Sequence, residues 1–250
     1  MMGGMPLQER FFPESRFGGF TRVDGTMAFY TRVHALLRPE MTVVDFGCGR
    51  GAYQDDPVPA RRELRILRGK VRQVIGLDIS SAGERNPFLD RFHRLDPDHP
   101  VWPLESDSAD MVICDQVLEH LLDPESFFTE ASRVLKSGGT LCIRTSNRWG
   151  YVGLASRLLP YRYHARLLAW VKQGTREEDV FPAYYRCSTL PALRRTLARH
   201  GFHAAVYGFE PEPAYLAFSG LTYWLGLQYG RLVPEALRSV VFAFGCLDKN

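Results

Sequence analysis

The sequence predicts an α/β fold, in which a doubly wound and mostly parallel sheet of seven strands carries helices on both faces. Two apolar runs, 42–46 and 74–79, are short and rich in β-branched residues, as is typical of parallel strands covered on both sides. Glycines follow the first run at alternate positions, and a stretch with helical spacing separates it from the second. Repetition of this strand, turn and helix unit indicates a doubly wound sheet.

Helix and strand signals alternate along the rest of the chain. An amphipathic helix over 26–37 precedes the first strand, and Pro57 and Pro59 delay the first crossover helix until about Ala60. Pro124 marks the start of a helix after the fourth strand. Further strands are predicted near 92–95 and over 110–115, 141–145, 202–209 and 239–247, the last one antiparallel, and further helices over 190–200 and 213–229.

Charge and cysteine content narrow the class of protein. The formal net charge of +3 is small for 250 residues and argues against an electrostatic nucleic-acid binder, which needs a concentrated basic surface. The five cysteines are scattered without metal-type spacing, so we expect reduced core residues of a cytoplasmic protein and no metal site. The sequence does not open with a basic region and an apolar run, so no signal peptide is expected.

The turn after the first strand carries the strongest functional signal. Gly47, Gly49 and Gly51 let the backbone approach a ligand where a Cβ would collide. The acids Asp45 and Asp78 lie where the first two strands end. Each has two interpretations: a helix N-cap, or a contact to a nucleotide-type cofactor. For Asp78 the contact would be to the ribose, whose two hydroxyls need two acceptor oxygens.

From about 41 to 145 the chain resembles the class I S-adenosylmethionine (SAM) dependent methyltransferases, in particular the branch related to ubiquinone and menaquinone biosynthesis. The resemblance is carried by Asp45 with the evenly spaced glycines, by Glu119 and His120 after the fourth strand, and by the segment 130–140. NAD-dependent dehydrogenases place the third glycine one residue later. The resemblance implies a Rossmann-like sheet, SAM as cofactor and S-adenosylhomocysteine as its product.

The same resemblance implies a set of cofactor contacts. Asp45 would orient the turn toward the positively charged methionine end, and Asp78 would hold the ribose. Asp96 is preferred to Asp98 beside adenine, because it would end the third strand. The expected cofactor contacts are Asp45, Gly47, Cys48, Gly49, Gly51, Asp78, Ile79, Asp96, Asp115, Gln116 and Val117.

Length and composition fit one enzyme domain with additions. A chain of 250 residues with 45% hydrophobic and 24% charged residues can bury one large core. Its predicted parts are an N-terminal cap helix region over 1–40, a SAM-binding half over 41–146, a substrate lid over 147–187 and a C-terminal half of the sheet over 188–250.

The chemistry depends on the accepting atom. We expect a small-molecule, lipid-linked or glycan-linked acceptor, with oxygen preferred, and an oxygen acceptor benefits from a base that removes its proton. His120 is the first candidate for that base and His164 in the lid the second; a structural histidine that caps the next helix is the alternative for His120. Carbon or nitrogen methylation, a noncatalytic SAM-pocket scaffold and an NAD-dependent oxidoreductase remain alternatives.

The segment 213–229 contains no charged residue and is shorter than the roughly 20 residues that a spanning helix needs. It is interpreted as a helix packed on the edge of the sheet, either as plain core or as a wall for a lipophilic acceptor or a peripheral membrane contact. The sequence leaves the oligomeric state open.

Overall fold

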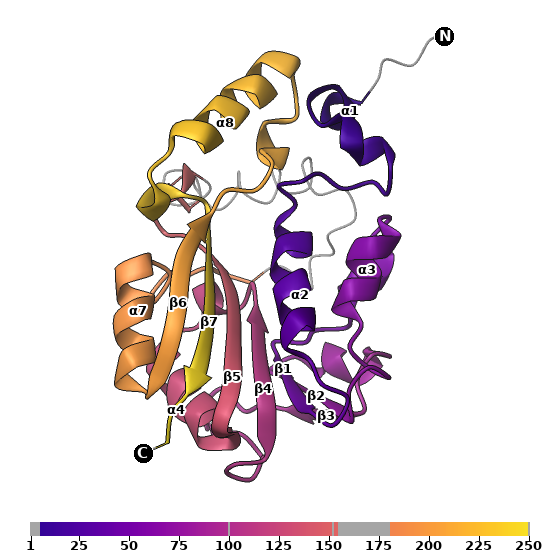
Figure 1. Ribbon diagram of the computed structural model, residues 1–250. Helices are drawn as coiled ribbons and strands as arrows, with labels where there is room; N and C mark the ends of the chain where they lie inside the picture. The colour runs from indigo at the N-terminus through magenta and orange to yellow at the C-terminus, as the bar shows by residue number, and fades with distance from the viewer. Residues whose placement is uncertain (1–5, 100, 152, 155–180, 250) are drawn as a thin grey trace.

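One seven-stranded sheet, in the order β3-β2-β1-β4-β5-β7-β6, organises the residues that the computed structural model describes, 6–99, 101–151, 153–154 and 181–249 (Figure 1). β7 is antiparallel to its neighbours β5 and β6, whereas the pairs among the other strands are parallel. This confirms the predicted doubly wound fold. The strands are β1 Thr42–Phe46, β2 Gln73–Asp78, β3 Arg91–Arg94, β4 Ala109–Asp115, β5 Leu135–Ser146, β6 Phe202–Phe209 and β7 Val240–Leu247.

The helices begin where the sequence supplies caps. Asp24 accepts hydrogen bonds from the backbone amides of Thr26 and Met27, both at 2.9 Å, and so begins α2. Asp123 caps α4 in the same way, with Pro124 in the first turn. The helices are α1 Leu7–Phe11, α2 Gly25–Leu36, α3 Pro59–Arg65, α4 Pro124–Val134, α7 Leu190–Arg199 and α8 Gly220–Leu232.

Alternate residues of the strands fill two cores, one on each face of the sheet. On one face Val44 and Leu77 pack with Phe128 of α4 and Leu193 of α7, all fully buried. On the other face, the buried side chains come from strands and from α2: Val43, Met111, Ile113, Cys142, Phe29 and Val33. Because β1 contributes to both cores, its carboxyl end is held rigidly between the two helical layers.

Two elements differ from the sequence-based expectation. The expected helix over 213–229 is two pieces, the short 3-10 turn Ala214–Leu216 and α8, because the Ser219 hydroxyl caps a new helix by accepting from the amide of Thr222. α8 lies beyond the carboxyl ends of the parallel strands, close to α1, instead of covering the sheet edge (Figure 1).

β5 starts earlier than expected. Ala109 pairs with Leu135 and Met111 with Thr140, so a bulge that contains Gly138, with φ +79°, lies inside the strand. The two glycines therefore lie within β5, at a break in its register with β4, and not before the strand. Among the described helices none is long and apolar enough to cross a bilayer.

Candidate functional site

The glycine turn after β1 allows neighbouring groups to approach its backbone closely. Gly47, Gly49 and Gly51 have φ values of +74°, +50° and +71°. A Cβ on Gly47 would lie 2.3 Å from Val117, and one on Gly51 would lie 2.7 Å from Asn86, so both glycines are needed for packing. A Cβ on Gly49 would meet no described atom within 4 Å. The middle glycine therefore leaves open space where a ligand can reach the backbone.

Asp78 ties this turn to the end of β2. One carboxylate oxygen accepts from the Gly49 amide at 2.8 Å and the other from the Ser80 amide at 2.8 Å. The Asn86 side chain donates to the carbonyls of Cys48 and Gly49, at 3.1 and 3.2 Å. Asn86 is not among the residues expected from the sequence, because a single asparagine outside any motif carries no signal.

Asp45 lies at the end of β1 on the face covered by α2 and α3. Its side chain lines a small cavity together with Tyr30, Tyr53 and Arg65. Among the described residues, burial and nearby charges act on this carboxylate, and no hydrogen bond does. Burial, with the nearby charge of Asp115, raises the pKa of Asp45 to about 7, against the opposing effect of Arg65. The carboxylate is thus held without a close partner.

Asp115, at the end of β4, is by contrast fully paired. Arg144 of β5 binds it through two hydrogen bonds of 2.5 and 2.8 Å, and the Tyr30 hydroxyl donates to it at 3.0 Å. Although burial by itself raises the pKa of Asp115, the charges of Arg144 and Arg65 hold it below the usual range. This carboxylate is therefore already bound by Arg144 and Tyr30. The expected contact between Asp115 and the cofactor stays a prediction.

Arg65 of α3 is a second residue of the site that was not expected from the sequence. Its guanidinium lies 3.6 Å from Asp115 and 4.8 Å from the centre of the Tyr53 ring, and its Nε is buried with no partner among the described residues. A buried donor without a partner is costly unless a ligand satisfies it. The arginine-rich helix pattern gave no sign that this one side chain points toward the strand ends.

The turn after β4 faces the glycine turn. Gln116 has a φ of +59°, unusual for a residue other than glycine, and its amide donates to the Arg144 carbonyl at 2.7 Å. Its side-chain oxygen accepts from the Ser146 hydroxyl at 3.1 Å. Val117 packs over Gly47. Strained backbone of this kind gathers at functional sites.

The Glu119 carboxylate is buried and accepts hydrogen bonds from the hydroxyls of Thr145 at 2.7 Å and Ser146 at 3.0 Å. Its backbone carbonyl accepts from the amides of Tyr184 and Tyr185, at 2.7 and 3.0 Å. Glu119 therefore joins the end of β5 to the segment that begins at 181.

His120 is half-buried beside the same segment. Its Nδ1 lies 2.9 Å from the carbonyl oxygen of Pro182. Because a carbonyl can only accept, Nδ1 must carry the proton, and in the neutral ring Nε2 is left as an acceptor. The contact with the neighbouring segment thus favours the neutral tautomer that carries its proton on Nδ1.

The other expected residues lie farther from this arrangement or outside it. Cys48 is buried with its sulfur against Gly76, and Ile79 is largely exposed. Asp96 lies beyond the end of β3, exposed, with His99 2.9 Å from its carboxylate. His164 and most of the expected lid lie outside the described residues. Within the described part of the chain no cluster of three histidine, cysteine or acidic side chains could hold a metal.

Comparison with known proteins identifies the family to which the chain belongs. The profile of a family described as "Methyltransferase domain" matches residues 24–206, most of the chain. The chain belongs to this methyltransferase family. A SAM-dependent methyltransferase structure from Mesorhizobium loti has the same fold, with a TM-score of 0.53 and 19% identity over 88% of this chain and 97% of that one.

The names of curated relatives indicate which cofactor the family uses. The chain is 35% identical over 109 residues to a probable S-adenosylmethionine-dependent methyltransferase of Mycolicibacterium smegmatis, covering 42% of this chain and 38% of that protein. It is 30% identical over 149 residues to the ubiquinone biosynthesis O-methyltransferase of Idiomarina loihiensis, covering 56% and 54%. The chain spans about half, or less, of the length of these curated relatives. The expected family, class I SAM-dependent methyltransferase, and the expected cofactor, SAM, are confirmed.

The residues of the site fit SAM. The open space beside Gly49 admits a ligand close to the backbone, and each Asp78 oxygen, with one amide bond, can accept again from a ribose hydroxyl. The carboxylate of Asp45 and the guanidinium of Arg65 line the same cavity. An acidic and a basic side chain that line one cavity match the ammonium and carboxylate of a methionine group.

Proposed function

We propose that this protein transfers a methyl group from SAM to an oxygen of a small-molecule, lipid-linked or glycan-linked acceptor. The observation that carries the proposal is the hydrogen bond between His120 and the Pro182 carbonyl, which leaves Nε2 of a neutral ring as an acceptor at the carboxyl edge of the sheet. The name of the Idiomarina relative, an O-methyltransferase, supports the same choice of atom.

Four residues would hold the cofactor. Asp78 would accept from the ribose hydroxyls, the Gly49 backbone would pass beside the amino-acid group, and Asp45 and Arg65 would bind its ammonium and carboxylate. When bound, SAM supplies an electrophilic methyl group on a sulfonium that leaves as a neutral sulfide. The protein then has to align the acceptor, exclude water and remove one proton.

His120 would perform the proton transfer. Nε2 would accept the proton that the acceptor hydroxyl gives up when its oxygen takes the methyl group, and the imidazolium so formed would then release that proton to water. Glu119 would act as a positioning residue, because it holds the backbone on which His120 lies against β5 and the 181–185 segment. The five cysteines are free thiols, which supports the proposal that the protein acts in a reducing cytoplasm.

Mass spectrometry of products formed from isotope-labelled SAM in cell extract would identify the acceptor and its atom. With that acceptor, His120→Ala should lower kcat by roughly 10²–10⁴-fold, the usual contribution of a general base, and leave the dissociation constant of SAM within about twofold. His203→Ala is the matched control, since this histidine side chain is 83% exposed on β6.

A loss of less than threefold in His120→Ala would instead favour carbon or nitrogen methylation, which needs alignment but no strong base. Protein that binds SAM and yields no product with any extract would favour the noncatalytic scaffold.

A further inference from the structure

α8 presents an apolar stripe to solvent. Leu221, Leu225 and Leu232 are 67%, 51% and 82% exposed and share one face of the helix, and Trp224, 46% exposed, borders them. Of the residues of α8, only Tyr223 and Gly226 are buried. Large exposed side chains that follow one helical face mark a contact surface more often than isolated ones do.

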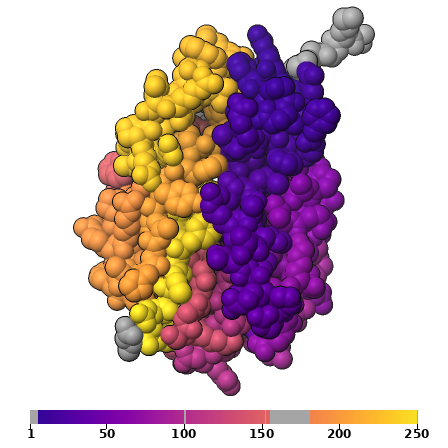
Figure 2. All heavy atoms as spheres, in the orientation of Figure 1, coloured from indigo at the N-terminus to yellow at the C-terminus, as the bar shows by residue number. Residues whose placement is uncertain are grey.

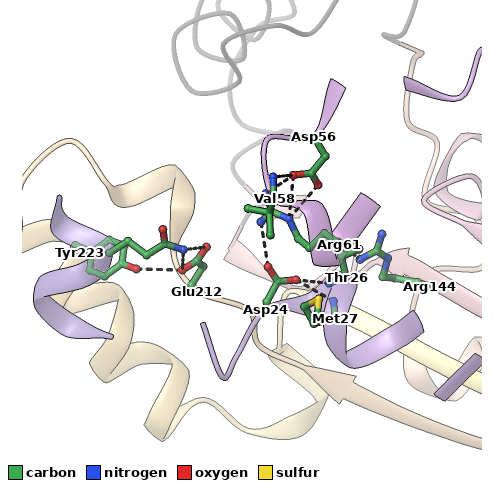
Figure 3. Close-up of polar contacts among 10 residues, drawn as sticks. Asp24, Thr26, Met27, Asp56, Val58, Arg61, Arg144, Glu212 and Tyr223 are labelled. Carbon is green, nitrogen blue, oxygen red and sulfur yellow. Dashed lines mark hydrogen bonds and ion pairs between the residues drawn. The ribbon is translucent and has the colours of Figure 1, made fainter. Parts of the chain in front are cut away.

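Arginines lie at both ends of this stripe, and one exposed acid, Glu235, follows α8 in the short turn Glu235–Leu237. No residue from 213 to 230 is charged. The preceding acid, Glu212, turns toward the protein, where Gln8 donates to it at 3.1 Å and the Tyr223 hydroxyl at 3.4 Å (Figure 3). The two ends carry exposed arginines: Arg231 at the end of α8, and Arg10, whose Nη1 lies 3.6 Å from the Cβ position of Gly220.

The stripe lies on the same side of the molecule as the glycine turn. α8 and α1 lie together beyond the carboxyl ends of β1, β4 and β5, the edge that carries the glycine turn and Asp45 (Figure 1). The two terminal segments also meet on the face seen in Figure 2, where the yellow C-terminal part abuts the indigo N-terminal part. The rings of Phe11 and Tyr223, 5.3 Å apart, join α1 to α8.

We propose that this stripe, Leu221, Trp224, Leu225 and Leu232, docks on the surface of a lipid bilayer that contains anionic headgroups. The apolar side chains would enter the boundary between headgroups and acyl chains, while Arg10 and Arg231 would meet lipid phosphates. A helix of 13 residues offers a face of only about 20 by 10 Å, roughly 200 Å². A stable protein interface needs about 800 Å² on each partner, so the stripe is too small to hold a second copy.

Flotation with lipid vesicles tests this proposal without any methyl acceptor. The wild-type protein should float with vesicles of phosphatidylcholine and phosphatidylglycerol, and less with phosphatidylcholine alone. The double variant Leu221→Ser/Leu225→Ser should lower the partition coefficient by about 100-fold, the effect of losing two leucines from an apolar environment. Val101→Ser is the matched control, because Val101 is also 67% exposed, in the loop before β4.

SAM binding by the double variant, measured by calorimetry, should equal that of the wild type, which keeps this test separate from the proposed activity. The proposal is overturned if the wild type stays at the bottom of the gradient with both vesicles, or if the double variant floats equally well. It is also overturned if sedimentation finds that the wild type is a dimer and the double variant a monomer, because the stripe would then be an interface between copies.

Discussion

Asp45 and Asp78 end neighbouring strands, yet their surroundings differ. Each oxygen of Asp78 accepts a backbone amide, whereas the carboxylate of Asp45 has burial and a nearby acid but no donor among the described residues. A buried carboxylate without partners destabilises the fold when it ionises. The structure therefore separates a residue that stabilises the turn from one whose charge a cationic ligand would satisfy.

Asp45→Asn should stabilise the ligand-free protein while weakening SAM binding. The folded pKa of about 7 lies above the ordinary 3.8, so the folded protein keeps a proton that the unfolded chain releases. The destabilisation by Asp45 therefore grows as pH rises from about 4 to 7 and is complete above it, at up to about 4 kcal/mol. Thermal unfolding should find the variant more stable at pH 8 and nearly equal at pH 4.5.

SAM titrations of the same variant should find the affinity lowered about tenfold or more, since one charge-assisted contact is lost. Equal stability of both proteins at pH 8 would contradict the assigned environment of Asp45.

Gly49→Ala should block the cofactor and spare the fold. Its Cβ meets no described atom within 4 Å, so the folding cost is only that of the left-handed backbone, about 1–2 kcal/mol. Gly69→Ala is the matched control, because Gly69 has a φ of +81° and equally open surroundings away from the site. Calorimetry should find SAM binding lost in the first variant and kept in the second; equal affinities would place the ligand elsewhere.

At the scale of elements, α2 and α3 form the cover of the site. Arg61 of α3 bonds Asp24 at the start of α2 at 3.0 Å and Asp56 at 2.7 Å (Figure 3). The same two helices carry Tyr30 and Arg65 to the ends of β1 and β4. One ion-pair network thus sets the spacing of two site residues from outside the site.

Asp24→Ala should lower stability by about 2–4 kcal/mol, because the variant loses a helix cap and leaves a half-buried arginine with one partner fewer. In a thermal scan this corresponds to a midpoint lower by about 5–12 °C. Asp123→Ala removes an exposed cap of α4 alone and should cost only about 1 kcal/mol.

The affinity for SAM should fall in Asp24→Ala and stay unchanged in Asp123→Ala. The opposite order of the two effects would mean that the cap of α2 has no special link to the site.

At the scale of the whole molecule, the sheet buries four of the five thiols. Cys48, Cys114, Cys142 and Cys187 are buried and Cys246 is exposed. Burial raises the pKa of Cys142 to about 12 and raises that of the other buried thiols as well. These thiols lie in or beside the sheet and the glycine turn, so their protection reports on the entire core.

A thiol titration of the native protein at pH 8 should therefore find one fast-reacting cysteine, and five after unfolding in guanidinium. The Cys246→Ser variant should have no fast thiol. A second fast thiol in the native protein would mean that one of the two cores is open to solvent.

Features that depend on neighbours along the chain follow from the sequence alone. Apolar runs placed β1, β2 and β6, the cap before Pro124 placed α4, and the glycine spacing placed the turn of positive φ after β1, because pattern, caps and positive φ are local properties. Tertiary structure alone decided which buried charges meet. Arg144 reaches Asp115 across 29 positions, and Arg65 lies 3.6 Å from Asp115 and lines the cavity of Asp45 only because α3 packs over the strand ends. The place of α8 was decided in the same way, since an uncharged helix suits a core and an exposed surface equally well, and its contact with α1 determines which it becomes.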